Sequence, residues 1–303
     1  MLTPADVHGV IVAIVTPFTD SGDLHEDALR TITSYVLEGG VDGIMTTGGT
    51  GEFPSLSRDE RQRVTRVVVE EVANRVPVFA GTAACSTWET ILLSQDAREA
   101  GADAVIVTAP YYFRLPLRSL FQHYRDLARS ADLPVVVYNN PLYTGNNLPP
   151  ELIAELAGVD GVIGVKQSNP DLGQLVELIR LAGDRISLCT GIDSQFYPSL
   201  CAGAQGIFST AACVIPREMA ELYAAFRAGH HGRARHGHRR IQTLNRFLEY
   251  DPGYVAPCKE ALRLLGLPGG RVRPPLPDLT DVERAAMADA LMELGLLKSG
   301  ART

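Results

Sequence analysis

Cysteine and tryptophan are scarce in this sequence, with five cysteines and one tryptophan among 303 residues. The cysteines are odd in number and scattered, and no two have the close spacing that is typical of zinc ligands. They stand at Cys85, Cys189, Cys201, Cys213 and Cys258. This pattern argues against a disulfide-stapled secreted domain, and we expect reduced thiols in a cytoplasmic protein.

Long apolar runs and an excess of positive charge are also missing. No segment approaches the roughly 20 apolar residues that a membrane-spanning helix needs, and the first six residues lack the charged-then-apolar pattern of a signal peptide. The formal net charge of −7 argues against a nucleic-acid partner. The composition, 46% hydrophobic and 21% charged, is that of a globular protein with a large core.

A repeated pattern predicts the fold. Each copy is a glycine, a small apolar residue, a polar residue, a glycine or alanine and a β-branched residue, and the copies begin at Gly40, Gly101, Gly158 and Gly203. The leading glycine suits the C′ position of a helix, where φ is positive, and the following residues open a strand. Further strand-like runs lie between the copies, at 10–15, 76–80, 133–138 and 185–189.

Helical stretches alternate with these strands, and the spacings Ser57–Glu60 and Ser86–Glu89 are typical of capping boxes at helix starts. Eight strand–helix units, roughly 20 to 35 residues apart, predict a (β/α)8 TIM barrel. We assign it to residues 1–228. The alternative is an open doubly wound sheet, which the regular alternation disfavours.

The remaining residues, 229–303, contain no convincing strand and predict a carboxyl-terminal helical extension. A helix at 211–228 precedes the extension, whose own helices are expected at 230–249, 254–266 and 280–297, with breaks at Pro252 and over 268–277. Histidines gather in its first part, at His230, His231, His236 and His238. Such a tract can bind a metal, but the interleaved arginines and the lack of nearby carboxylates favour a solvated helix face.

Lys166 is the most informative single residue. It ends the apolar run 161–165, which predicts a buried parallel strand. The carboxyl end of such a strand lies where ligands bind in α/β proteins. Desolvation there favours the neutral amine, which attacks carbonyls to form Schiff bases. The alternative is structural, with the stem packed in the barrel and the ammonium paired with solvent or a carboxylate.

Other predicted strand ends carry matching groups. The glycine-rich loop 46–53 can form an anion site for a carboxylate or a phosphate from its backbone N–H groups and the Thr50 hydroxyl, although a tight turn would also need its glycines. Tyr138 places a phenol one unit before Lys166, where it can shuttle protons. Tyr111 and Tyr112 follow the fourth strand, where aromatic packing at an interface is an equally common use.

Together these segments resemble the dihydrodipicolinate synthase / N-acetylneuraminate lyase family in order and spacing. The motifs are Gly48-Gly49-Thr50-Gly51-Glu52, Pro110-Tyr111-Tyr112, Tyr138-Asn139-Asn140-Pro141 and Gly164-Val165-Lys166, and the resemblance extends from Val10 to the final helices. It implies a lyase that captures pyruvate or another 2-oxo acid, built as a homotetramer from pairs of tight dimers. No metal or organic cofactor is implied, because the imine serves as the electron sink.

The resemblance also implies roles by position. Lys166 resembles the Schiff-base lysine and Tyr138 the tyrosine that relays protons. Gly49 and Thr50 resemble the pair that binds the carboxylate of the 2-oxo acid. Tyr112 resembles a phenol lent across a subunit interface, and Phe208 aligns with a residue that lines the pyruvate pocket through its backbone.

Two positions depart from the family pattern. Gly49 stands where synthases carry a serine or threonine whose hydroxyl joins the proton relay, and the loop instead resembles that of 5-keto-4-deoxyglucarate dehydratases. Tyr143 stands where synthases carry an arginine that binds the second substrate's carboxylate. Tyr112, Asn140 and Pro141 resemble aldolase or synthase members more than that dehydratase.

From these features we expect first an aldolase that acts on a 2-keto-3-deoxy or 4-hydroxy-2-oxo acid and releases pyruvate. The alternatives are a dehydratase or deaminase that uses the same imine, and a dihydrodipicolinate synthase. A barrel that only binds a 2-oxo acid is a remote alternative, which the presence of both Lys166 and Tyr138 disfavours.

Overall fold

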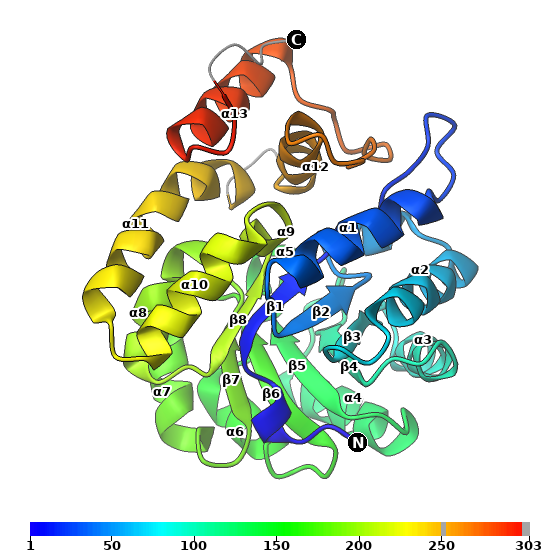
Figure 1. Ribbon diagram of the computed structural model, residues 1–303. Helices are drawn as coiled ribbons and strands as arrows, with labels where there is room; N and C mark the ends of the chain where they lie inside the picture. Colours follow the sequence, from blue (N-terminus) through cyan, green and yellow to red (C-terminus); the bar gives the residue numbers. More distant parts are fainter. Residues whose placement is uncertain (250–252, 299–303) are drawn as a thin grey trace.

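A computed structural model describes residues 1–249 and 253–298, and it forms a closed barrel of eight parallel strands (Figure 1). The strands are β1 (Gly9–Ala13), β2 (Gly43–Thr46), β3 (Val78–Gly81), β4 (Ala104–Thr108), β5 (Val135–Asn139), β6 (Val162–Gln167), β7 (Ser187–Thr190) and β8 (Gly206–Ser209). Each strand pairs with its neighbours in the sequence, and β8 closes the barrel against β1. The predicted TIM barrel is confirmed.

Helices surround the barrel and extend beyond it. Those that follow successive strands are α1 (Glu26–Glu38), α2 (Arg58–Val72), α3 (Thr87–Glu99), α4 (Leu117–Ser130), α5 (Pro141–Thr144), α6 (Pro150–Leu156), α7 (Leu172–Ala182), α8 (Phe196–Ala202), α9 (Ala211–Val214) and α10 (Pro216–Arg227). Short 3-10 helices are η1 (Pro4–Asp6), η2 (Phe53–Ser55) and η3 (Asp193–Gln195). The expected helix at 211–228 is wrong as one unit, because Pro216, which lacks a backbone N–H, starts α10 separately.

The carboxyl-terminal extension is helical, as predicted. It consists of α11 (His231–Leu248), α12 (Val255–Leu264) and α13 (Asp281–Glu293), and the expected break at Pro252 lies outside the described residues. Three of its clustered histidines are exposed, as a solvated helix face requires, whereas His238 is partly buried near the Tyr197 ring. Within the described ranges, no group of three histidine, cysteine or acidic residues could hold a metal ion.

The repeated glycines behave as the pattern predicts at three of four positions. Gly40, Gly101 and Gly203 have φ values of 83°, 92° and 108° after their helices. Gly158 was expected to do the same, but the positive φ falls instead on Gly161, at 90°. In this copy β6 begins at Val162, four residues after the leading glycine, whereas the other three strands begin three residues after theirs, and Gly161 directly before β6 takes the positive φ.

The two predicted capping boxes differ in outcome. Ser57 caps α2 with both reciprocal hydrogen bonds to Glu60. Ser86 caps α3 by accepting a hydrogen bond from the backbone N–H of Glu89, and the return bond from the glutamate side chain is not formed. Both helices nevertheless begin where the sequence predicted.

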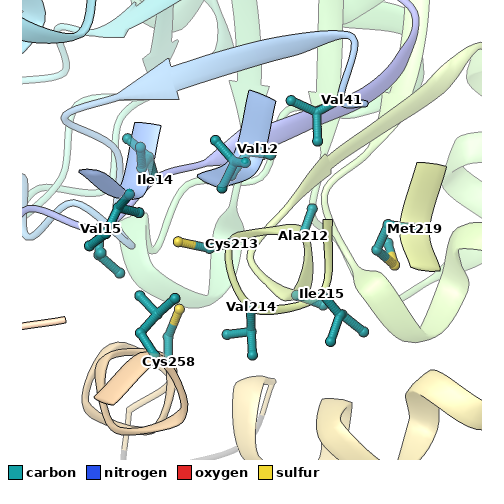
Figure 2. Packing of buried hydrophobic residues seen from close by; sticks show 14 of the residues in the cluster. Val12, Ile14, Val15, Val41, Ala212, Cys213, Val214, Ile215, Met219 and Cys258 are labelled. Carbon is teal, nitrogen blue, oxygen red and sulfur yellow. The ribbon is translucent and has the colours of Figure 1, made fainter. Parts of the chain in front are cut away.

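The extension joins the barrel through one continuous apolar cluster. Figure 2 shows α9, with Cys213 and Val214, lying between barrel residues such as Val12 and Val15 and the α12 residue Cys258. The extension is therefore part of the same core as the barrel.

All five cysteines are free thiols, and those at 189, 213 and 258 are buried. No described helix is long and apolar enough to cross a membrane.

Candidate active site

Lys166 and Tyr138 lie side by side in the sheet. They are register partners in the β5–β6 ladder, so both side chains point into the barrel, where the lysine is 5% and the tyrosine 8% exposed. The Lys166 Nζ lies 4.2 Å from the centre of the Tyr138 ring and 5.7 Å from that of Phe208. Nζ also lies 3.9 Å from Met45 Sδ, within the distance of a weak hydrogen bond to sulfur. The amine therefore lies in an apolar, aromatic pocket, as the Schiff-base reading requires.

The structural alternative for Lys166 has its ammonium paired with solvent or with a carboxylate, and at 5% exposure the residue has little access to solvent. Among the described residues, no carboxylate oxygen lies within ion-pair distance, 4.0 Å, of its Nζ, although other lysine and arginine pairs do meet this limit. Gly191, just after β7, makes room for the lysine, because a Cβ atom there would lie 2.6 Å from Lys166 Cε and 2.1 Å from Ser168 Oγ. A glycine at position 191 is therefore needed to leave space for the Lys166 side chain.

Asparagines fix the ends of β5 and β6. The side-chain amide of Asn140 donates a hydrogen bond of 2.9 Å to the Tyr138 hydroxyl, which leaves the tyrosine's own proton free to point elsewhere. Asn139 points outward and donates to Gln167 Oε1, at 3.0 Å, and to the Leu148 carbonyl, at 3.1 Å. Together these bonds hold the phenol and the amine in register.

The glycine-rich loop between β2 and η2 approaches the same end of the barrel. The Thr50 hydroxyl lies 3.0 Å from that of Thr210, and Thr16 donates to the Gly51 carbonyl at 2.8 Å. Two non-glycine residues of the loop, Thr47 and Glu52, have positive φ values of 48° and 56°. Such backbone is costly unless its surroundings impose it, and it is common at functional sites.

A buried ion pair anchors this loop to the extension. The side chain of Lys259, on α12, is 1% exposed and that of Glu52 is 0% exposed. Lys259 Nζ lies 2.5 Å from Glu52 Oε1. The other carboxylate oxygen accepts a hydrogen bond of 2.9 Å from the backbone N–H of Arg273. Burial lowers the pKa of Lys259, and the charge of Glu52 opposes that shift. Sequence reasoning assigned no role to either residue.

These elements enclose a cavity of about 330 Å3. Four of the six predicted site residues line it, namely Gly49, Thr50, Tyr138 and Lys166. The other lining residues are Asn140, Leu142, Tyr143, Ser168, Pro170, Gly191, Ile192, Asp193, Ser194, Gln195, Thr210, Leu248, Glu249 and Tyr254. The sequence pattern thus brings together an amine, a phenol and the expected anion-binding loop.

Two predicted site residues do not line this cavity. Tyr112 is 87% exposed, has a positive φ of 82° and packs its ring edge against that of Phe113. Phe208 is 1% exposed, and its ring lies inside the barrel against Phe79 and the lysine amine.

Sequence reasoning also missed the acidic side of the cavity. Asp193 is buried and accepts hydrogen bonds from the Ser209 hydroxyl and from the backbone N–H groups of Thr210 and Ala211. Burial raises its pKa. Glu249, at the end of α11, has a pKa raised to about 7, first by burial and then by the charge of Asp193.

Comparison with known proteins places the chain among close relatives. Residues 6–294 match the Dihydrodipicolinate synthetase family. A protein named 4-hydroxy-tetrahydrodipicolinate synthase from Pelobacter propionicus is 39% identical over 291 residues, which cover 95% of this chain and 99% of the relative. A protein of the same name from Syntrophus aciditrophicus is 40% identical with the same coverage.

Solved structures agree. Dihydrodipicolinate synthase from Thermotoga maritima is 35% identical with a TM-score of 0.91, covering 96% of this chain and 99% of its own. YagE, a prophage protein of this family from E. coli K12 solved in complex with pyruvate, is 31% identical with a TM-score of 0.92 and the same coverage. With these matches over nearly its whole length, the chain belongs to the Dihydrodipicolinate synthetase family and is a lyase.

Proposed function

We propose that this lyase binds a 2-oxo acid of the pyruvate type as an imine on Lys166 and makes or breaks a carbon–carbon bond. The observation that carries the proposal is the position of the Lys166 amine, which lies over the Tyr138 ring without a carboxylate partner among the described residues. Such an amine is available for nucleophilic attack. A pyruvate complex of the related YagE supports the choice of ligand.

The proposed reaction begins with attack of the Lys166 amine on the C2 carbonyl. Tyr138 then protonates the hydroxyl of the addition product, water leaves, and an imine forms. The cationic imine withdraws electrons, so that a C3 proton can pass to a water molecule in the cavity, and the C3–H electron pair forms the enamine double bond. The backbone N–H groups of Gly49 and Thr50, with the Thr50 hydroxyl, are proposed to bind the carboxylate.

The names of the relatives favour the synthase alternative over the aldolase that the sequence analysis expected first. In that reaction the enamine would attack the aldehyde carbon of aspartate semialdehyde. Relatives near 40% identity over the whole chain carry the synthase name, which makes this condensation the first candidate for the second half of the reaction.

An aldolase remains the second candidate because of one feature of the cavity. Tyr143 lines it, and no arginine is among its described lining residues. A second substrate with a carboxylate would therefore lack a guanidinium partner from this chain, whereas a neutral aldehyde would need none.

Trapping with borohydride tests the shared imine. The sequence contains three lysines, Lys166, Lys259 and Lys298, so the modified peptide is easily assigned. Pyruvate with borohydride should give a stable mass adduct on the Lys166 peptide. Lys298→Ala should keep the adduct and Lys166→Ala should lose it. An adduct that persists in Lys166→Ala would refute the proposal.

A substrate screen separates the candidates. Pyruvate with aspartate semialdehyde tests the synthase, and kcat/KM above roughly 10⁴ M⁻¹s⁻¹ would assign it. Release of pyruvate from 2-keto-3-deoxygluconate or 4-hydroxy-2-oxoglutarate would assign the aldolase. Consumption of 5-keto-4-deoxyglucarate without pyruvate would assign the dehydratase instead.

The homotetramer and the cytoplasmic location also stay proposals. Five free thiols fit a reducing compartment, and the exposed Tyr112 fits a role at a neighbouring subunit.

A further inference from the structure

Tyr254, about two hundred residues away in the sequence, fills the space next to Gly49 that a side chain at position 49 would occupy. A Cβ atom built on Gly49 would lie 2.1 Å from the Tyr254 hydroxyl oxygen and 3.4 Å from the ring carbon that bears it. Any side chain at position 49 would therefore collide with that hydroxyl. Position 49 therefore needs glycine as long as the Tyr254 phenol stays in place, because the phenol hydroxyl occupies the volume where the Cβ of a serine or threonine would lie.

Tyr254 is held in this position from two sides. It is the residue that precedes α12, and Lys259 on the same helix forms the buried ion pair with Glu52 of the glycine-rich loop. Its ring also packs edge-on against that of Tyr143, with centroids 6.1 Å apart. The phenol is partly buried and lines the cavity together with Tyr138 and Lys166. Its placement against the loop is therefore fixed.

Imine chemistry at Lys166 needs more than one proton donor. Tyr138, once it has given its proton to the departing water, is left as a phenolate and must be reprotonated. The Asn140 amide already donates to the Tyr138 oxygen but cannot give up a proton. A phenol keeps its proton at neutral pH, so Tyr254, which lines the same cavity, carries a proton that it can pass on.

We propose that Tyr254 is the relay residue that returns a proton to Tyr138, supplying from the position just before α12 the hydroxyl that Gly49 lacks. The inference rests on the proposed imine at Lys166. Both phenols line the same cavity, so the step passes through a water molecule between them. The Tyr254 O–H bond breaks as its proton binds that water, the water gives one of its protons to the Tyr138 phenolate, and solvent at the cavity mouth then reprotonates Tyr254. No group other than water is needed to complete the balance.

The test uses pyruvate alone, so it does not depend on the second substrate. Exchange of the pyruvate methyl protons in D2O, followed by NMR, reports formation of the enamine through the imine. Tyr254→Phe removes only the hydroxyl and should slow exchange about 10- to 100-fold, less than the 10²- to 10⁴-fold expected for a direct acid–base group. Tyr223→Phe, which removes a phenol on α10 that donates to the Gln205 carbonyl, is the matched control and should exchange normally.

A reciprocal rescue distinguishes a relay from a packing role. Gly49→Ser alone should be impaired, because its side chain meets the Tyr254 hydroxyl. In Gly49→Ser/Tyr254→Phe the Cβ faces the ring at an ordinary contact distance, and the serine hydroxyl replaces the lost one. The double variant should therefore exchange faster than either single variant.

The outcomes are separable from those for the imine itself. If the wild type neither exchanges pyruvate protons nor gives an adduct on Lys166, the proposed function fails. If the wild type does both, exchange in Tyr254→Phe equal to that of the wild type would overturn the relay. A double variant no faster than Tyr254→Phe would overturn it too.

Discussion

At the scale of single residues, the site depends on two neighbouring side chains whose roles can be measured separately. Lys166 and Tyr138 are register partners, so a change to the phenol leaves the amine and its strand in place. A third side chain, the partly buried carboxyl of Glu249, lies on the cavity wall. One prediction concerns Tyr138 and a second concerns Glu249.

Tyr138→Phe should lower kcat about 10²- to 10⁴-fold, because the phenol is proposed to give the proton that expels water. The ring beneath Lys166 Nζ is preserved, so pyruvate should still bind. Steady-state kinetics with the substrate found in the screen would measure the change. An unaltered kcat with a raised KM would show that the tyrosine only binds.

Glu249→Gln should flatten the pH dependence of stability. Folding raises the pKa of this carboxyl from 4.5 to about 7, so its favourable contribution is complete below about pH 4.5 and is lost as the pH rises through 7. The thermal midpoint of the wild type should therefore fall, relative to that of Glu249→Gln, between these values. Glu151→Gln, at an exposed glutamate of α6, is the control. Parallel curves for wild type and Glu249→Gln would contradict the assignment.

At the scale of elements, the barrel was predictable and the contacts between distant elements were not. The repeated glycine pattern indicated the strands, and the apolar run before Lys166 placed the amine at a strand end, where β6 has it. Local periodicity carries that information. The partners of Gly49 and Glu52 are Tyr254, just before α12, and Lys259, on α12, and no local pattern links positions about two hundred residues apart. Tyr112 was likewise given its site role from a sequence motif, and a motif does not show whether a side chain points into the cavity or away from it.

The ion pair between α12 and the loop should dominate the stability of this contact. Lys259→Met leaves the Glu52 carboxylate buried without its partner, which should cost about 3–5 kcal/mol in the free energy of unfolding. Urea denaturation would measure it. Glu52→Gln/Lys259→Met removes both charges and should cost less than the single change. Lys298→Met, at an exposed lysine, should cost almost nothing, and an equal loss in all three would refute the argument.

At the scale of the whole molecule, the proposed tetramer gives a role to Tyr112, which does not contribute to the cavity of its own chain. Tyr112 matches the family motif but is 87% exposed and does not line the cavity of its own chain. Large exposed aromatic side chains are typical of protein interfaces. Light scattering should give about four times the 32.7 kDa chain mass.

Mixing two inactive variants tests whether Tyr112 acts in a neighbour's site. Lys166→Ala and Tyr112→Ala should each be impaired as pure proteins. If the phenol is lent across the interface, unfolding and refolding them together should restore part of the activity, because some sites receive an intact lysine and an intact tyrosine. Activity no higher than the sum of the two separate samples would contradict sharing.

The buried contact between Glu52 and Lys259 also has a consequence for how the chain is made. On the ribosome the loop emerges early, and 207 residues (259 minus 52) must follow before its partner exists. At roughly 5–20 residues per second this takes about 10 to 40 seconds. The eight strands can all have been synthesised by then, yet the loop still lacks the counter-charge that α12 brings. The contact between Glu52 and Lys259 can therefore form only after all eight strands have been synthesised, and α13, which packs on α12, is made later still.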